Sequence, residues 1–208
     1  MSAQGVFISF EGIDGSGKST QARLLAEALR AQGRDVVLTR EPGGSAGAEE
    51  IRRLVIEGAG DRWSPETEVL LFTAARRDHL ERVIAPALAR GAVVVTDRFA
   101  DSTRVYQGVA RADLRPMVDA LHRLVIGQEP DLTLLIDITP ATGLARADAR
   151  GGAEARFESF GLELQERLRA GFLALADEFS KRIAVINGGR GVEAVAEEVA
   201  RLVAARLP

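Results

Sequence analysis

A glycine-rich run near the amino terminus, Gly12-Ile13-Asp14-Gly15-Ser16-Gly17-Lys18-Ser19, has the GxxxxGK[S/T] pattern of a phosphate-binding loop. Glycines let such a loop turn successive backbone N–H groups toward phosphate oxygens, in conformations that a Cβ atom would forbid. The ammonium group of Lys18 can add a positive charge at the outer phosphates, and the hydroxyl of Ser19 can ligate Mg²⁺. The sequence therefore predicts a site for a nucleoside triphosphate.

The apolar runs around this motif predict the elements that must position it. Residues 6–10 read as a buried strand before the loop, and a helical pattern follows it. Similar runs at residues 36–39, 92–96, 132–138 and 183–186 are typical of parallel strands that are buried on both faces. The intervening segments are long enough for crossover helices, and Ser64-Pro65 has the pattern of a helix start. We expect an α/β fold, a three-layer sandwich with a five-stranded parallel sheet of the P-loop NTPase type.

The chain is 208 residues long, which fits a single domain, residues 1–208, with a small lid. Residues 146–156 break the core-forming pattern with arginines, alanines and paired glycines, so we predict the lid there. Arginine supplies all of the basic residues except Lys18 and Lys181, and we attach no function to that bias.

Composition excludes several functional classes. The formal net charge of -3 provides no overall attraction to nucleic acid or to an anionic membrane, so no such partner is expected. The absence of cysteine excludes disulfides, thiolate zinc sites and cysteine nucleophiles. The N-terminal residues lack the pattern of a secretory signal, and no apolar run is long enough to span a bilayer. We therefore expect a cytoplasmic protein.

Triphosphate binding alone leaves the reaction open. A guanine-nucleotide switch would carry an NKxD segment, which this sequence lacks, and motor or transport ATPases are usually longer. A small-molecule kinase suits the length and the arginine-rich segment, because phosphoryl transfer needs several guanidinium donors.

Further motifs make the sequence resemble the thymidylate kinases along nearly its whole length. They are residues 10–20, Thr39-Arg40-Glu41-Pro42-Gly43-Gly44, Leu71-Phe72 through Arg76 to His79, Asp97-Arg98-Phe99 through Ser102 to Tyr106-Gln107-Gly108, and Pro130-Asp131-Leu132-Thr133. This resemblance implies transfer of the γ-phosphoryl group of ATP to dTMP, which gives ADP and dTDP for dTTP synthesis. It also implies a homodimer packed through helices.

The resemblance implies an ATP site with Mg²⁺ as cofactor. Lys18, Asp14, Arg98 and Arg150 would be the catalytic residues. Ser19 would ligate the metal directly, and Asp97 would hold it through water. The ATP-binding residues would be Gly12, Ile13, Asp14, Gly15, Ser16, Gly17, Lys18, Ser19, Thr20 and Arg146.

For the acceptor dTMP, the resemblance places Phe72 against the thymine ring. Arg76 and Thr103 would hydrogen-bond to the base, and Arg98 would bind the phosphate with the help of Arg40. The ring of Tyr106 would lie against the sugar C2′, where a ribose hydroxyl would clash. The remaining residues of this pocket would be Pro42 and Gln107.

The lid offers Arg146, Arg150 and Arg156 as donors to the transferring phosphoryl group. Arg150-Gly151 matches the family pattern, but Ala155 stands before Arg156 where an acidic residue is usual, so Arg150 is preferred. Two alternatives to a thymidylate kinase stay open from the residues alone. One is a kinase for another nucleoside monophosphate, and the other is a nucleotide-dependent binding module without catalysis.

Overall fold

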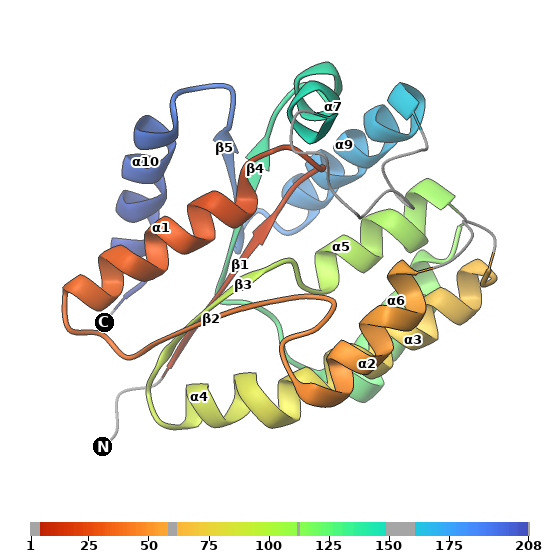
Figure 1. Ribbon diagram of the computed structural model, residues 1–208, viewed down its shortest axis with the longest axis horizontal. Helices are drawn as coiled ribbons and strands as arrows, with labels where there is room; N and C mark the ends of the chain where they lie inside the picture. Colours follow the sequence, from red (N-terminus) through yellow and green to blue (C-terminus); the bar gives the residue numbers. More distant parts are fainter. Residues whose placement is uncertain (1–4, 58–61, 112, 149–160, 208) are drawn as a thin grey trace.

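The computed structural model describes residues 5–57, 62–111, 113–148 and 161–207. Its centre is a parallel sheet with the strand order β2-β3-β1-β4-β5 (Figure 1). The strands are β1 (Val6–Glu11), β2 (Val36–Arg40), β3 (Val93–Asp97), β4 (Leu132–Asp137) and β5 (Ile183–Asn187). All five predicted strands are confirmed, with small shifts at their ends, and the α/β sandwich is confirmed with them.

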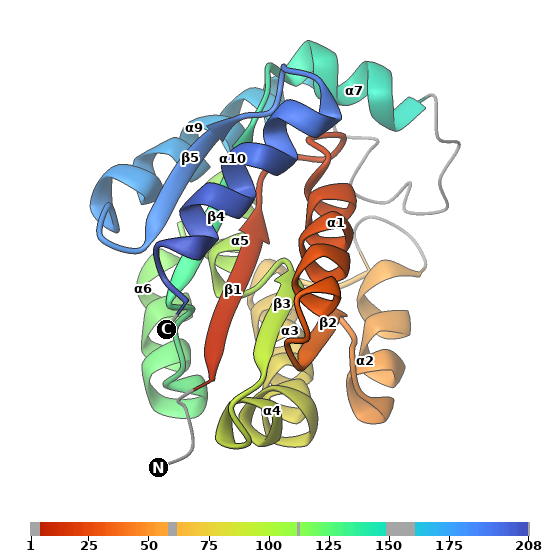
Figure 2. The same cartoon turned by 90° about the vertical axis from the view of Figure 1, so that its left-hand side faces the viewer.

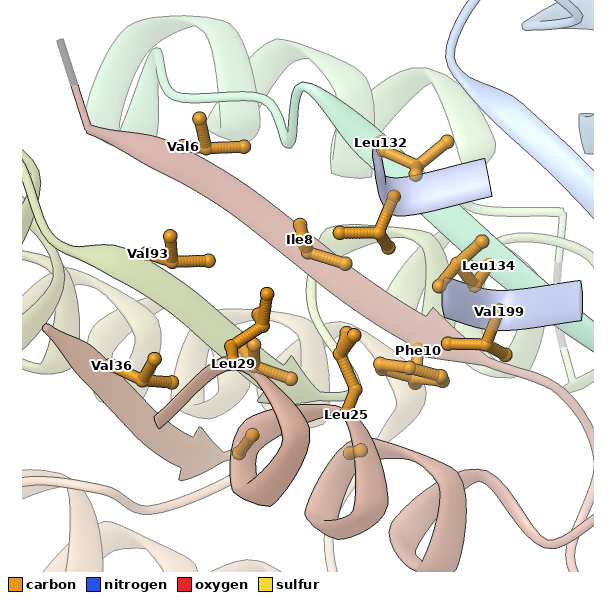
Figure 3. Packing of buried hydrophobic residues seen from close by; sticks show 14 of the residues in the cluster. Val6, Ile8, Phe10, Leu25, Leu29, Val36, Val93, Leu132, Leu134 and Val199 are labelled. Atoms are coloured by element: carbon orange, nitrogen blue, oxygen red, sulfur yellow. The ribbon is translucent and has the colours of Figure 1, made fainter. Parts of the chain in front are cut away.

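The apolar runs lack a polar alternation because helices cover both faces of the sheet. On one face, Ile8 and Phe10 of β1 pack in a core cluster with Leu25 of α1 (Lys18–Ala31) and Val199 of α10 (Val192–Ala204) (Figure 3). Phe7, which points to the opposite face, belongs to another cluster. Successive residues of a strand therefore fill two different cores.

The second face is covered by helices that carry much of the site. They are α3 (Pro65–His79), which continues through the π-helical η1 (Leu80–Ile84) into α4 (Ala85–Ala89), then α5 (Ala100–Val105) with η2 (Tyr106–Arg111), α6 (Arg115–Leu121) with η3 (His122–Ile126), and α9 (Gly161–Glu178). α2 (Ala46–Ile56) packs on α3, and α7 (Pro140–Asp148) follows β4.

Local sequence signals mark one end each of two helices. The hydroxyl of Ser64 accepts a hydrogen bond from the N–H of Thr67, so it caps α3, and Pro65 takes the first helical position. Gly33 follows the end of α1 with a left-handed backbone, φ +80°. Apolar residues from Phe157 to Phe179 recur with helical spacing, and this helix is described from Gly161 onward, as α9.

The register brings functional residues to one edge of the sheet. Phe10 of β1 and Arg40 of β2 both pair with Asp97, the last residue of β3. Figure 2 shows β1 rising into the loop that leads to α1, with β3 beside it. Because the strands are parallel, their carboxyl ends deliver side chains to a shared crevice.

Candidate active site

The glycine-rich loop joins β1 directly to α1, as its sequence predicts. Gly12 and Gly15 have φ angles of +140° and +77°. A Cβ atom on Gly15 would lie 2.1 Å from the backbone oxygen of Gly143 in α7, so only glycine fits there. Gly17 is the N-cap of α1 at φ +96°, and the N-terminus of that helix is suited to binding an anion.

Lys18 begins α1 and points back into the loop. Its Nζ donates to the carbonyl oxygen of Ile13 at 3.3 Å and to a carboxylate oxygen of Asp14 at 3.4 Å. Burial and the nearby guanidinium of Arg98 lower the pKa of Lys18, whereas Asp14 favours its charged form. A phosphate oxygen at this amine would stabilise the positive charge further.

Arg98 follows β3 and faces the loop from the opposite side. One of its terminal nitrogens, Nη2, lies 2.5 Å from Asp14 and 3.3 Å from the hydroxyl of Tyr106, while Nη1 donates to Ser102 Oγ at 3.0 Å. The guanidinium carbon lies 5.1 Å from the centre of the Tyr106 ring, a cation–π contact. The fork of donors is thus aimed between the loop and α5.

The charges of this cluster reinforce one another. Burial alone would raise the pKa of Asp14, but Arg98 and Lys18 outweigh burial and hold the pKa well below its usual value. Burial favours the neutral form of Arg98, yet Tyr106 and Asp14 raise its pKa overall. Asp14 is therefore ionised and Arg98 charged at neutral pH. Arg98 can accordingly exchange one anionic partner, the carboxylate of Asp14, for another, a phosphate group.

A second arginine, Arg76 of α3, lies deeper in the crevice with 4% of its surface exposed. Its Nε donates to Glu41 at 2.7 Å, and its Nη2 donates to Thr103 Oγ1 at 3.0 Å and to the carbonyl oxygen of Phe99 at 3.2 Å. Phe72 stands one helical turn before Arg76, so an aromatic face and a planar donor approach the same space.

These groups line one cavity of about 460 Å³, enough for a nucleotide-sized ligand. It brings together most of the predicted side chains: Asp14, Lys18, Ser19, Arg40, Pro42, Phe72, Arg76, Asp97, Arg98, Thr103, Tyr106 and Gln107. The loop residues that line the cavity are Asp14, Lys18 and Ser19. The other predicted residues of the loop lie between or next to them in sequence: Gly12, Ile13, Gly15, Ser16, Gly17 and Thr20. The side chain of Ile13 packs in the core cluster with Leu135 and Leu168, so its predicted contact with ATP can be made only by its backbone.

The predicted lid residues have a different standing. Arg146 of α7 donates to the carbonyl oxygen of Gly188 at 3.4 Å, which places it between α7 and the loop that precedes α10. Arg150 and Arg156 lie outside the described residues.

The crevice fits a hydrated Mg²⁺ that is held partly by a bound phosphate. Asp97 Oδ1 is buried without a hydrogen-bond partner among the described residues, and Ser19 lines the same cavity. No group of three carboxylates or histidines that could form a metal cage occurs in the described part of the chain. A small set of oxygen ligands completed by water and phosphate is what Mg²⁺ prefers.

Sequence reasoning missed the carboxylates behind the two arginines. Glu41 accepts a hydrogen bond from Arg76. Glu11 accepts three hydrogen bonds from Phe99 and Ser102, the residues that follow Arg98. A charged residue that ends an apolar strand, as Glu11 does, is the signal that could have revealed the second of them. His79 is fully buried between Thr39 and Glu41.

Among the described residues, no helix combines the length and the apolar character needed to cross a bilayer.

Comparisons with known proteins agree along the whole chain. A family model described as thymidylate kinase matches residues 10–199. A thymidylate kinase from Ruegeria pomeroyi is 68% identical over 207 residues, which cover 100% of this chain and 98% of that protein. One from Caulobacter vibrioides is 57% identical, with 98% of each chain covered. A crystal structure of thymidylate kinase from Ehrlichia chaffeensis superposes with a TM-score of 0.78 at 36% identity, covering 96% of this chain and 99% of that one.

Proposed function

The chain belongs to the thymidylate kinase family, and from that premise we propose how its own residues transfer the γ-phosphoryl group of ATP to dTMP, giving ADP and dTDP on the route to dTTP. The observation that carries this proposal is a single cavity that holds Lys18 and Asp14 of the loop together with Arg98, Arg76 and Phe72. The loop is suited to the triphosphate and the opposite wall to a nucleoside monophosphate.

On the donor side, the N–H groups of the loop bind the phosphates of ATP. Lys18 stabilises the charge that builds on the transferring group, and its burial strengthens that interaction. Ser19 and Asp97 would hold Mg²⁺, the latter through water. When bound, the metal supplies Lewis-acid neutralisation of phosphate charge.

On the acceptor side, Arg98 releases Asp14 to bind the phosphate of dTMP, with Arg40 assisting. An oxygen of this phosphate attacks the γ-phosphorus in line, and the bridging oxygen leaves with ADP. Asp14 then faces the acceptor sugar rather than the triphosphate. The chain's contribution is position and fixed charge, since no covalent enzyme intermediate is needed.

The thymine base lies on Phe72, with Arg76 and Thr103 as hydrogen-bond donors and Pro42 and Gln107 completing the wall. Gln107 is itself held by Glu68, whose carboxylate accepts from its amide at 3.3 Å. The ring of Tyr106 stands beside the sugar and opposes a 2′-hydroxyl. Arg146 would contact ATP, and Arg150 would reach the transferring phosphoryl group from the lid, residues 146–156.

A panel of acceptors tests this function. Purified protein with ATP and Mg²⁺ is given dTMP, dUMP, dCMP, dGMP, dAMP and UMP, and ADP release is followed together with product identity. We expect the highest kcat/KM for dTMP and low turnover with UMP. Preference for another monophosphate would favour the alternative kinase, and ATP binding without turnover of any acceptor would favour a binding module.

We also propose a homodimer that acts in the cytoplasm. Leu70 of α3 is 51% exposed and Leu124 of η3 is 77% exposed, and these two elements pack together through the bond from Arg77 to the carbonyl oxygen of Val125. An exposed apolar pair on adjoining helices is suited to a partner helix. Sedimentation should give a dimer, and Leu124→Glu should shift it toward monomer, whereas a monomeric wild type would refute the proposal.

A further inference from the structure

Glu11 is the last residue of β1 and comes directly before the loop, yet its side chain turns away from the triphosphate site. Its surface is 1% exposed. Oε1 accepts hydrogen bonds from the backbone N–H groups of Phe99 at 2.8 Å and Ser102 at 3.2 Å, and Oε2 accepts one from Ser102 Oγ at 2.6 Å. Burial raises the pKa of Glu11 to about 7, and nearby Asp101 adds to the rise, so the carboxylate depends on these donors.

Ser102 connects Glu11 to Arg98. A serine hydroxyl has one proton to donate, and here Glu11 accepts it. The lone pairs of Oγ are then free to accept from Arg98 Nη1, which lies 3.0 Å away. The carboxylate of Glu11 therefore fixes the orientation in which Ser102 can accept from the guanidinium.

The backbone of Arg98 is also held from β1. Arg98 has a φ of +71°, a left-handed conformation that costs a non-glycine residue about 1 kcal/mol or more. Its N–H donates to the carbonyl oxygen of Phe10 at 2.9 Å, its carbonyl oxygen accepts from Thr96 Oγ1 at 2.9 Å, and the next N–H, of Phe99, donates to Glu11. Consecutive residues of β1 thus hold the turn on which the guanidinium is mounted.

We propose that Glu11 is a positioning residue for dTMP binding: it orients Arg98, through Ser102 and through the turn at Phe99, to receive the phosphate of the acceptor. This inference rests on the proposed role of Arg98 and deepens it. The competing interpretation is that Glu11 only stabilises the start of α5, because it accepts hydrogen bonds from the N–H groups of Phe99, the N-cap, and of Ser102. The two interpretations differ in what they predict for phosphate recognition.

Glu11→Gln is the discriminating variant because the amide cannot satisfy all the donors that the carboxylate receives. If its oxygen faces Phe99, its NH₂ group faces Ser102 Oγ, which must then accept and turn its own proton elsewhere. If the amide flips, its NH₂ group meets the N–H groups of Phe99 and Ser102. Either arrangement disturbs Arg98 while leaving the loop sequence intact.

The readout is equilibrium binding of dTMP compared with thymidine, which lacks the phosphate, at about pH 8, above the pKa of Glu11, where its side chain is ionised. For Glu11→Gln we expect dTMP affinity to fall ~10- to 100-fold, the range for one disrupted buried hydrogen bond to a charged group, while thymidine affinity stays at the wild-type value. In kinetics, the KM for dTMP should rise while the KM for ATP is unchanged. Equal losses for dTMP and thymidine, or wild-type affinity for both, would overturn the proposal.

Glu129→Gln serves as the matched control. Like Glu11, Glu129 is a carboxylate that holds a residue of α5, since its Oε1 lies 2.6 Å from the buried Arg104, but it lies outside the cavity. Its loss should lower thermal stability without changing the dTMP-to-thymidine ratio. If wild-type protein itself binds thymidine as tightly as dTMP, then the role of Arg98 fails rather than that of Glu11.

A double-variant cycle with Ser102→Ala tests the route. Because Glu11 and Ser102 act in one chain of hydrogen bonds, the double variant should lose little more dTMP affinity than the more damaging of the two single variants loses. Additive losses would overturn the relay. If Glu11→Gln does not fold, Ser102→Ala alone must still lower dTMP affinity selectively, and Ser102→Thr, which keeps the hydroxyl, must restore it.

Discussion

Arg76 is buried and Arg98 is partly exposed, and the two arginines meet partners of different kinds. Arg98 pairs with Asp14 of the glycine-rich loop, and the phosphate of dTMP can take the place of this carboxylate as the partner of Arg98. Arg76 pairs with Glu41, which has its own contact to His79 and stays in place when the base arrives. Arg98 can change its partner from Asp14 to a phosphate. Arg76 keeps its partner Glu41, and a fixed guanidinium suits hydrogen bonds to a base.

Lys18→Ala should lower kcat by ~100- to 1000-fold or more, the scale of removing one preorganised electrostatic donor. The reason is that Lys18 is the buried cation of the loop and nothing else in the loop carries positive charge. Steady-state turnover of ATP with dTMP measures the loss. The chain supplies its own control, since Lys181 is the only other lysine and is exposed, so Lys181→Ala should retain full activity.

Arg76→Ala should weaken dTMP binding ~10- to 100-fold and leave ATP affinity close to wild type, because Arg76 lies on the acceptor wall of the cavity. Calorimetric titration of each nucleotide separates the two effects. The variant also leaves Glu41 buried without its cation, so a lower Tm is expected. Arg77→Ala, at the exposed neighbour that pairs with Glu81, should change neither affinity, and matched losses of both nucleotides in Arg76→Ala would contradict the role.

At the residue scale, the position of a side chain was predictable where a motif fixes a backbone or a strand end. Lys18 and Asp97 reach the cavity because the loop and the end of β3 carry them there. Glu11 and Ser102 were missed because their importance lies in mutual contacts across 91 positions of sequence, which no local pattern records. Arg98 shows both cases: its place was predicted, and its left-handed backbone was not.

At the scale of elements, the glycines of the loop and of the helix end differ in their surroundings. Gly15→Ala should abolish tight ATP binding, because the added Cβ would meet Gly143 at 2.1 Å and displace the loop from α7. Gly33→Ala has a similar φ, +80°, but nothing lies within 4 Å of the added atom. It should cost about 1 kcal/mol of unfolding free energy and leave ATP affinity unchanged.

ATP titration and urea unfolding of both glycine variants check this prediction. Wild-type ATP affinity in both Gly15→Ala and Gly33→Ala would show that the close approach of Gly15 to α7 is not needed for ATP binding.

The strands were predictable because each is an apolar run, and α1, α3, α9 and α10 because each has a periodic apolar face or a capping residue. Ser64 is an example, since its hydroxyl caps the first turn of α3. The strand order β2-β3-β1-β4-β5 was not predictable, since pairing depends on which apolar surfaces meet after the chain collapses. The π-helical turns after α3, α5 and α6 also lack a local signal in the sequence.

At the scale of the whole molecule, buried Glu11 links folding stability to pH. Its pKa rises from an ordinary value of 4.5 to about 7 in the fold, so the folded state binds the proton more tightly than the unfolded state does. The stabilisation from Glu11 is therefore fully present below about pH 4.5 and is lost as the pH rises through about 7. Wild type should lose stability relative to Glu11→Gln over this range.

Urea unfolding of both proteins at about pH 5 and about pH 8 measures the difference, and all other titrating groups cancel to first order. A gap between wild type and Glu11→Gln that is the same at both pH values would mean that Glu11 keeps an ordinary pKa in the fold.

The ion pair between Asp14 and Arg98 gives the cavity a counterion from the chain itself. Stray sulfate or inorganic phosphate meets a guanidinium whose charge is already neutralised, and would have to displace a carboxylate that is tethered in place. A nucleotide can recover that cost from its base on Phe72 and Arg76, which a bare anion cannot do. The ion pair at the phosphate end of the pocket therefore favours a nucleotide over an inorganic anion, although it does not contact the base.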